Sequence, residues 1–464
     1  MFDLCDDLGG SNRREFLRIG SLGLGAAALP QLLATRAAAE AAKTPLTTGK
    51  SVIFLFLHGG PSQYETFDPN MTASAPYCSL TGEVATSVPG VTFGGTFQRL
   101  APLADKLAIV RSYRSGSGDH KLQPLICDET LNANPGSLYA RVVGTNHPRH
   151  GLPTNVGLFP NAVDPDGPGA NQGFGRFDST GTLGTAYQPF IPGAGGPVQE
   201  NMKLRIARER VDDRRSLLRQ LDRIRRDADS DGRFDGLDGF EQQAFDVVLG
   251  GVASAFDLSR EDPRTVARYD TSHLHRPALW ADKNNRKHYA ANAKSLGKLL
   301  LLARRLCEAG CGFVTVSTAF VWDMHADVNN LEMPRGMDLV GSPLDHALSA
   351  YVEDVEARGL SDDILLVVTG EMGRTPRANK GGGRDHWGAI TPLLLYGGGL
   401  PRGHVVGQSS RDGGEPGTEP ITTANLISTI MHRLFDVGTL RLDPALPGDV
   451  LRVATEGRPI PGLH

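Results

Sequence analysis

The sequence predicts an α/β protein whose central β-sheet is mostly parallel and covered by helices on both faces. Two patterns support this prediction. Short apolar runs rich in β-branched residues alternate along the chain with segments of helical periodicity. Glycine and proline, with 56 and 30 residues, are too frequent for a helical bundle and indicate many ordered loops. Apolar residues make up 40% and charged residues 22% of the 464 residues, which excludes wholesale disorder.

The expected strands are read from their apolar runs. The first run, 51–57, is almost continuously apolar and ends at His58-Gly59-Gly60-Pro61. Such a run fits a buried parallel strand that breaks into a loop at its carboxyl end. Helical patterns at 296–309 and 344–358 each precede a further strand. The complete set of expected strands is 51–57, 107–110, 312–317, 363–369 and 390–396.

A long insertion separates the second and third expected strands. Residues 151–198 are rich in Gly, Pro and Asn and predict extended loop, whereas 199–258 have a helical pattern. We interpret the charged run 205–226 as a solvated helical face. The mature chain is therefore expected to be one elaborated α/β domain over 40–464, with a loop and helical insertion at 151–260.

Residues 1–39 have the features of an export signal rather than of a fold. Asn12-Arg13-Arg14-Glu15-Phe16-Leu17-Arg18 matches the twin-arginine consensus, a modest apolar stretch follows, and Ala37-Ala38-Ala39 offers a cleavage site. We expect the twin-arginine translocase to be a partner during export and the mature protein to be periplasmic or extracellular. No other segment has about 18 uninterrupted apolar residues, so no membrane span is expected in the mature protein.

The charge balance limits the partners. The 48 basic and 52 acidic side chains give a formal net charge of −4. There is no basic excess to neutralise phosphate backbones, so nucleic-acid binding is not expected. A small anionic ligand stays compatible with this balance, because a few metal ions and arginines would bind it.

Residues able to bind metal follow three of the expected strands: His58, then Asp323 and His325, then Glu371, Asp385 and His386. In open α/β sheets, ligands gather at the carboxyl ends of strands. Strand-like residues two apart share a face, so Asp323 and His325 would point the same way. Each histidine alone would more often be a hydrogen-bonded loop residue, but the set predicts a metal site. Imidazole and carboxylate ligands suit zinc or manganese, which we expect as the cofactor.

Four motifs carry a resemblance. They are His58-Gly59-Gly60-Pro61-Ser62, Trp322-Asp323-Met324-His325, Gly370-Glu371-Met372-Gly373-Arg374-Thr375-Pro376 and Gly383-Arg384-Asp385-His386-Trp387. Together they resemble a family of twin-arginine-exported, sulfatase-related bacterial proteins of largely unknown function. That family looks like a branch of the alkaline phosphatase superfamily, and the resemblance spans nearly the whole chain. It implies an alkaline-phosphatase-like α/β fold.

The resemblance also implies roles. Asp323 and His325 look like the Asp-plus-His element of the superfamily, Glu371 like its acid after a later strand, and His386 like its final His. Its nucleophile, a Ser or Thr, follows the second strand, where this chain has Ser117 in a Gly-flanked loop. Metal coordination would activate such a hydroxyl. The alternative is a flexible polar loop without a catalytic role.

Two departures from the superfamily pattern stand out. The first strand ends in His58 where an Asp is usual, and Met372 stands where a His is usual. Either the metals are held differently, or one metal site is weakened or absent. Sulfatases of this superfamily mature a Cys or Ser within a C/S-x-P-S-R motif. Neither Cys78-Ser79-Leu80-Thr81 nor Cys127-Asp128-Glu129-Thr130 fits it, which argues against a formylglycine sulfatase.

Three further side chains complete the candidate site. His120 follows the same loop as the candidate nucleophile and would be either a ligand or a general acid/base. Arg374 and Arg384 would either clamp an anionic ester or pair with Glu371 or Asp385.

A separate acidic pattern lies in the insertion. Residues 227–238 have acidic groups at positions 1, 3, 5 and 9 and Gly at position 6, as in a calcium loop. Position 12 is Asp238, which is shorter than the usual Glu, so the affinity should be lower. The candidate calcium ligands are Asp227, Asp229 and Asp231, and an acidic turn between helices is the alternative.

The sequence thus favours an exported metal-dependent hydrolase of phosphate or sulfate esters, related to sulfatases but without a formylglycine motif. Its partner would be a small anionic ester or a sulfated or phosphorylated glycan. The alternative is a non-catalytic anion- or glycan-binding cell-surface protein on a degenerate phosphatase-like scaffold. The departures at His58 and Met372 favour the binding protein. The enzyme is favoured by the retained Asp323, His325, Glu371 and His386.

Overall fold

The largest sheet of the protein has seven strands in the order β12-β4-β11-β8-β1-β7-β6. The computed structural model describes residues 46–148, 151–193 and 252–463. Within these ranges the sheet strands are β1 (Ser51–Phe56), β4 (Leu107–Val110), β6 (Asn155–Leu158), β7 (Phe313–Ser317), β8 (Ile364–Thr369), β11 (Leu393–Gly397) and β12 (His404–Val406).

All strands of this sheet except β11 run in one direction. The neighbours β8, β1, β7 and β6 are paired in parallel, and β12 is parallel to β4. The reversed strand β11 lies antiparallel to both β4 and β8, so these two strands share a direction. The predicted α/β class with a mostly parallel sheet is confirmed. The carboxyl ends of six strands therefore open at one edge of the sheet.

Each of the five apolar runs contains a strand of the sheet, whereas the sequence did not predict the strands β6 and β12. The strand β6 has only four residues, one of them Gly157, within a stretch rich in Gly and Pro that was expected to be loop. The strand β12 has three half-buried residues and lies at the edge of the sheet. Strands this short lack the continuous apolar run that identified the others.

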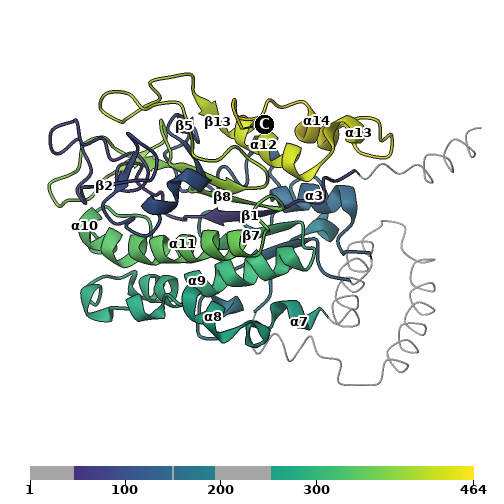
Figure 1. Cartoon of the computed structure of the whole chain (residues 1–464), viewed down its shortest axis with the longest axis horizontal. Helices are drawn as coiled ribbons and strands as arrows, with labels where there is room; N and C mark the ends of the chain where they lie inside the picture. The colour runs from purple at the N-terminus through teal and green to yellow at the C-terminus, as the bar shows by residue number, and fades with distance from the viewer. Residues whose placement is uncertain (1–45, 149–150, 194–251, 464) are drawn as a thin grey trace, which may run out of the picture. The chain divides into compact units, whose positions relative to one another are not determined.

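Helices cover both faces of the sheet (Figure 1). The helices α9 (Arg286–Glu308) and α11 (Ser342–Ala357) pack together along one face, and α9 contacts β1 and β7. On the other side, α3 (Pro135–Val143) contacts β6 and β7, and α12 (Thr423–Leu434) contacts β1. Buried on both faces, the parallel strands read as continuous apolar runs.

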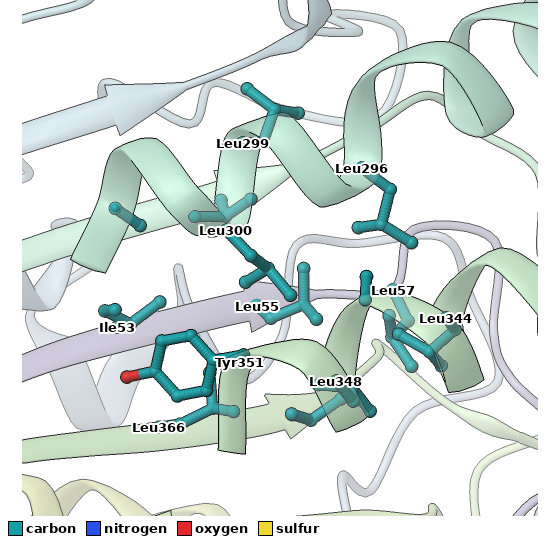
Figure 2. Packing of buried hydrophobic residues seen from close by; sticks show 14 of the residues in the cluster. Ile53, Leu55, Leu57, Leu296, Leu299, Leu300, Leu344, Leu348, Tyr351 and Leu366 are labelled. Atoms are coloured by element: carbon teal, nitrogen blue, oxygen red, sulfur yellow. The ribbon is translucent and has the colours of Figure 1, made fainter. Parts of the chain in front are cut away.

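The core between the sheet and α9 and α11 is aliphatic (Figure 2). Side chains of one strand alternate between faces, so Ile53, Leu55 and Leu57 of the β1 segment point the same way. Burying one such side chain contributes about 1.5–3 kcal/mol. Their labelled neighbours from the helices and from β8 are Leu296, Leu299, Leu300, Leu344, Leu348, Tyr351 and Leu366.

The remaining elements are short. The other strands are β2 (Glu83–Ala85), β3 (Thr92–Gly94), β5 (Tyr113–Arg114), β9 (Gly373–Arg374), β10 (His386–Trp387) and β13 (Ile421–Thr422). The other α-helices are α7 (Ala253–Phe256), α8 (Pro263–Tyr269), α10 (Met333–Gly336), α13 (Val437–Leu440) and α14 (Gly448–Thr455). 3₁₀ turns lie at Ala101–Lys106, Asp128–Thr130, Pro160–Ala162, Thr185–Tyr187, Leu258–Arg260, Ser272–Leu274 and Pro277–Leu279, and a π-helical turn at Met337–Gly341.

Some predictions concern segments beyond the described residues. The expected export signal, the charged helical run 205–226 and the candidate calcium loop 227–238 all lie outside them, and these stay predictions. Within the described ranges, no helix is both long and apolar enough to cross a membrane.

Candidate metal centre

The candidate site lies at the edge where the parallel strands end. His58 follows β1, His120 follows β4 and β5, and Asp323 with His325 follow β7. After β8 the chain forms a small antiparallel hairpin, in which Arg374 of β9 faces His386 of β10. Segments far apart in sequence are thus brought together because their strands share a direction.

The loops after β1 and β7 touch through their backbones. The N–H groups of Val321 and Trp322 donate to the His58 carbonyl at 3.1 and 3.2 Å. Gly59 has a φ of +118°, and a Cβ there would lie 2.6 Å from the Asp323 nitrogen. Only glycine permits this approach. It places the Gly59 N–H 2.8 Å from Glu371 Oε1 and so links three strand ends.

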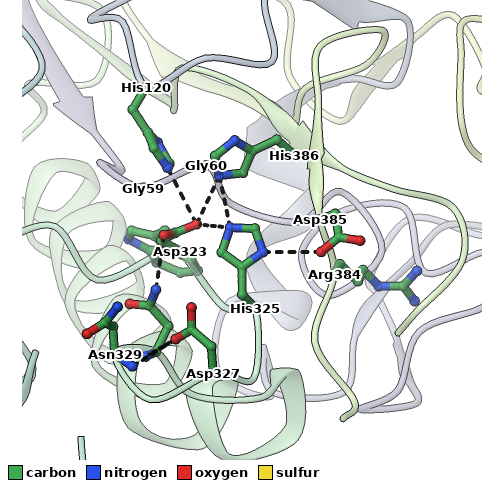
Figure 3. Close-up of polar contacts among 12 residues, drawn as sticks. Gly59, Gly60, His120, Asp323, His325, Asp327, Asn329, Arg384, Asp385 and His386 are labelled. Atoms are coloured by element: carbon green, nitrogen blue, oxygen red, sulfur yellow. Dashed lines mark hydrogen bonds and ion pairs between the residues drawn. The ribbon is translucent and has the colours of Figure 1, made fainter. Parts of the chain in front are cut away.

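Asp323 is the centre of the polar cluster (Figure 3). Its Oδ1 lies 2.8 Å from His325 Nε2, 3.3 Å from His386 Nε2 and 3.5 Å from His120 Nε2. The same oxygen accepts a hydrogen bond from Arg374 Nη2 at 2.8 Å, while Oδ2 accepts one from Asn330. The side chain is only 10% exposed, so these partners replace water around its charge.

Two carboxylates orient two of the imidazoles. Glu371 Oε1 lies 2.8 Å from His120 Nδ1, and Asp385 Oδ1 lies 3.3 Å from His325 Nδ1. A carboxylate oxygen accepts the N–H of each imidazole when the proton is on Nδ1. In that tautomer a neutral ring keeps a lone pair on Nε2 for an ion, and the donor Arg374 Nη1 lies 3.4 Å from His325 Nε2. Without an ion, a proton on Nε2 makes the hydrogen bond with Asp323. Such carboxylate–histidine pairs are the usual support of metal-binding imidazoles.

The donor set fits a metal ion. His120, Asp323 and His386 each offer a ligand atom, and these atoms lie within 4.8 Å of one another. His325 Nε2 lies 2.9 Å from His386 Nε2, so two imidazole nitrogens and one carboxylate oxygen converge on one small volume. Ligands of a tetrahedral ion with bonds near 2.0–2.1 Å stand about 3.3 Å apart. Without a cation, only shared protons would relieve the repulsion between these lone pairs.

The charges within the cluster shift two pKa values. Burial raises the pKa of Asp323, but the hydrogen bonds with the three histidines and the charge of Arg374 outweigh it and lower the pKa far below its ordinary value. For His120, burial lowers the pKa, while the bonds with Asp323 and Glu371 raise it more. The cluster therefore attracts positive charge, whether protons or a metal ion.

The two arginines of the site are fully buried and committed to protein acceptors. Arg374 donates through Nε to the Gly60 carbonyl at 2.7 Å, through Nη1 to the Arg384 carbonyl at 3.1 Å, and through Nη2 to Asp323. Arg384 pairs with Glu65 at 3.1 Å and lies over the Tyr64 ring. The expected alternative was an ion pair with Glu371 or Asp385, but the acidic partners are instead Asp323 for Arg374 and Glu65 for Arg384. Neither guanidinium faces solvent to clamp a substrate.

His58 occupies a different environment from the other histidines. Its ring centroid lies 5.0 Å from that of Phe320 and 5.6 Å from those of Phe174 and Phe177. The side chain is 1% exposed, and its Nε2 has no hydrogen-bond partner among the described residues. Burial lowers the pKa of His58, which favours the neutral ring. The structure therefore places His58 behind the cluster rather than among the converging donors.

Ser117 lies at the rim of the site. Its Oγ accepts a hydrogen bond from the Asp119 N–H at 3.2 Å, and its backbone packs against Gly388, just after the β10 strand. Among the described residues, no hydrogen bond joins its hydroxyl to the cluster around Asp323. Its role as nucleophile stays a prediction.

Sequence reasoning missed two residues of the site. Asn330 holds Asp323 Oδ2 at 3.1 Å, and its own N–H is bound by Asp327 Oδ1. The polar tract 327–330 carries a turn signal, but not the information that it faces the metal donors. Phe174 comes from the insertion and packs on His120, with ring centroids 5.0 Å apart. No periodic pattern marks it, because it lies in a Gly-rich loop.

Comparison with protein families gives a match to a model described as Protein of unknown function (DUF1501), over residues 49–460. The chain belongs to this family. The match covers every strand and helix of the described core, and it agrees with the motif resemblance to a family of largely unknown function. A search of the curated proteins finds no match.

Distant similarity to solved structures extends over most of the chain. One match is the PsFucS1 sulfatase from Pseudoalteromonas sp., with 10% identity, a TM-score of 0.37, and coverage of 89% of this chain and 73% of the other. A second is the phosphonate monoester hydrolase SpPMH from Silicibacter pomeroyi, with 11% identity, a TM-score of 0.33, and coverage of 83% and 73%. A third is Ps i-CgsB in complex with k-i-k-neocarrahexaose, with 9% identity, a TM-score of 0.33, and coverage of 83% and 71%.

Proposed function

We propose that this protein is a metal-dependent hydrolase of phosphate or sulfate esters with an alkaline-phosphatase-like arrangement of its site. The observation that carries the proposal is the convergence of His120, Asp323, His325 and His386 at the carboxyl edge of the sheet. Three imidazoles and one carboxylate are the ligands that zinc favours, and manganese is the second candidate. When bound, such an ion polarises an ester oxygen and lowers the pKa of a hydroxyl or a water.

The residues of the chain have distinct tasks in this proposal. Asp323, His325, His386 and His120 would hold the ion through the oxygen and the Nε2 atoms that converge. Glu371 and Asp385, which the sequence placed among the ligands, would instead fix the tautomers of His120 and His325. Arg374 keeps Asp323 ionised and correctly turned, because its guanidinium is locked by backbone carbonyls.

Metal content is the direct test. The protein purified after export should contain about one equivalent of zinc or manganese per chain for the cluster described. His386→Ala should lower the bound metal and ester hydrolysis together. The matched control is His404→Ala, because His404 begins β12 at the opposite edge of the sheet. Protein without bound transition metal, together with unchanged hydrolysis by His386→Ala, would refute the proposal.

The attacking group would be Ser117 or a water. Ser117→Ala should abolish turnover but keep the bound metal if the hydroxyl attacks, and should leave turnover within a few-fold if a water attacks. The variant is structurally mild, since Ser117 is partly exposed and its hydroxyl only accepts the Asp119 N–H.

A non-catalytic binding protein is the second candidate function. The specific observation that favours it is His58, where the superfamily pattern has an Asp ligand and where this chain has a ring enclosed by phenylalanines. A protein that binds metal and an anionic glycan, yet hydrolyses no member of a phosphate and sulfate ester panel, would support this candidate over the enzyme.

We also propose that the chain is exported by the twin-arginine pathway. Its support is the sequence of residues 1–39, with Arg13-Arg14 followed by an apolar stretch and an Ala-rich cleavage site. Replacing both arginines by lysine should keep the protein in the cytoplasm, which cell fractionation would detect. Export of that variant at the normal level would contradict the proposal.

A further inference from the structure

Two phenylalanines form an aromatic wall beside the metal donors. The wall consists of Phe174 from the insertion and Phe320 from the segment after β7, whose rings stack at 4.7 Å with 26° between their planes. Both rings contact His120, with centroids 5.0 and 4.7 Å away. His120 in turn lies 3.5 Å from the Asp323 oxygen, as Figure 3 shows. Through its contact with His120, the wall lies next to the atoms that would hold the ion.

The two rings of the wall differ in exposure. Phe320 is 8% exposed, whereas Phe174 is 38% exposed. The Phe174 ring stacks on Phe320 and makes an edge contact with His58. Leaving a large part of a phenyl ring in water forfeits hydrophobic stabilisation of about 25 cal/mol per Å². A ring of the substrate would recover this free energy by continuing the stack.

The arginines of the site do not offer the substrate a second contact. Arg374 and Arg384 are fully buried, and their N–H groups are bound by protein oxygens. The ion would therefore bind the phosphate or sulfate group, and the part of the substrate beyond it would meet the aromatic wall.

We propose that Phe174 is a specificity-determining residue that selects esters whose ester oxygen carries a six-membered ring with an apolar face. This inference rests on the proposed function and names its substrate class. Aryl groups and sugar rings share the required flat apolar face. Acyclic alkyl esters lack it. An offset stack of this kind contributes roughly a 2- to 10-fold gain in affinity.

Binding of phosphonates tests the inference without turnover. Phenylphosphonate, cyclohexylphosphonate and methylphosphonate carry the same anionic head and differ only in the group that would meet the wall. Titration calorimetry of the metal-loaded protein should give tighter binding of the ring compounds than of methylphosphonate by roughly 2- to 10-fold. Phe174→Ala should reduce this ratio to about one, and Phe174→Tyr should restore it. The ratio is the readout because any effect on the shared anionic head cancels in it.

The controls separate the possible outcomes. Leu279→Ala removes a large apolar side chain of similar exposure, 36%, and should leave the ratio intact. If Phe174→Ala loses the preference over methylphosphonate for phenylphosphonate alone, the substrate group at the wall is an aryl group. If the variant loses the preference for both ring compounds, a ring of either kind fits the wall. An unchanged ratio in Phe174→Ala overturns this inference alone. Failure of all three phosphonates to bind the metal-loaded wild type would overturn the proposed function as well.

Discussion

Among the described residues, two clusters of largely buried charged side chains are composed differently. In the first, between α8, α9 and α11, Arg304 and Arg305 lie 2.7 and 2.9 Å from Glu261 Oε2. Arg358 lies 2.9 Å from the other oxygen of Glu261 and 2.8 Å from Asp354. Each acid faces permanently charged guanidinium groups, so the cluster is complete without a ligand.

At the carboxyl edge of the sheet, the central carboxylate of Asp323 meets one arginine and three imidazoles. Asp323 meets Arg374 at 2.8 Å, but its other close partners, His120, His325 and His386, are bases that carry a proton only conditionally. The comparison separates a structural ion network from a candidate metal site. The first cluster joins helices without a ligand, whereas the second brings imidazole nitrogens and a carboxylate oxygen to a common point that a cation would complete.

The largest effect is expected from the shared carboxylate. Asp323→Asn keeps the shape of the side chain but removes the anionic ligand, so metal affinity should fall by more than ~100-fold. Isothermal titration with zinc would measure the change. Asp338→Asn is the matched control, because Asp338 forms an exposed ion pair with Arg276 at 2.6 Å. Equal metal affinity of the two variants would erase the distinction between the clusters.

A smaller effect is expected from the residue that orients His120. Glu371→Gln retains an acceptor for the Gly59 N–H but weakens the hold on the His120 Nδ1 proton. Metal affinity should fall by about 10- to 100-fold while the metal-free protein keeps its fold. Circular dichroism and zinc titration would check both points. If the metal-free Glu371→Gln variant lost its fold, Glu371 would have a structural role rather than a role in supporting the metal ligand.

In the structural cluster, the expected effect is on stability and its pH dependence. Burial raises the pKa of Glu261, but the hydrogen bonds from Arg305 and Arg304 and the nearby positive charges outweigh it and lower the pKa from 4.5 to about 2. A lowered pKa means that the carboxylate stabilises the fold above pH 4.5, and that this contribution is lost as the pH falls toward 2. Glu261→Gln should therefore cost about 1–2 kcal/mol at pH 7.

Denaturant unfolding of the wild type and of Glu261→Gln between pH 7 and pH 3 would measure this. The difference in unfolding free energy should shrink as the pH falls below about 4.5. Metal affinity should be unaffected throughout. A difference that stays constant with pH would show that packing rather than charge carries the effect of Glu261.

The smallest effect is expected for Asp385→Asn. The carboxylate of Asp385 is 66% exposed, and its oxygen lies 3.3 Å from His325 Nδ1. Water competes for such a contact, so metal affinity should fall less than about threefold. A change as large as that of Glu371→Gln would show that exposure is not what distinguishes the two supporting carboxylates.

The sequence predicted the sheet edge at which the candidate residues would gather, because that edge follows from the direction of the strands. The runs at 51–57 and 363–369 are almost continuously apolar and the run at 312–317 is rich in β-branched residues, which indicates strands buried on both faces, as in a parallel sheet. The carboxyl ends of such strands share an edge, so Asp323 and His386 could be expected together. The pairing of such strands is strongly fixed, because a shift by one residue would turn every side chain to the other face of the sheet.

The sequence could not predict how each side chain turns within that edge. His58 follows β1 as expected, but its ring packs against Phe174 and Phe177 of the insertion. Glu371 reaches the cluster only through His120. Both outcomes depend on contacts between loops that are distant in sequence and that no local pattern records.

The spacing of the donors along the chain sets the time at which the site can form. His120, Asp323 and His386 are more than half the chain apart at their extremes, and His386 reaches the others through the two-residue pairing of β9 with β10. During synthesis, no partly made chain that ends before this hairpin contains the full set. An ion held by all three residues would therefore bind only after this hairpin has been made, and would tie the first third of the chain to its last fifth.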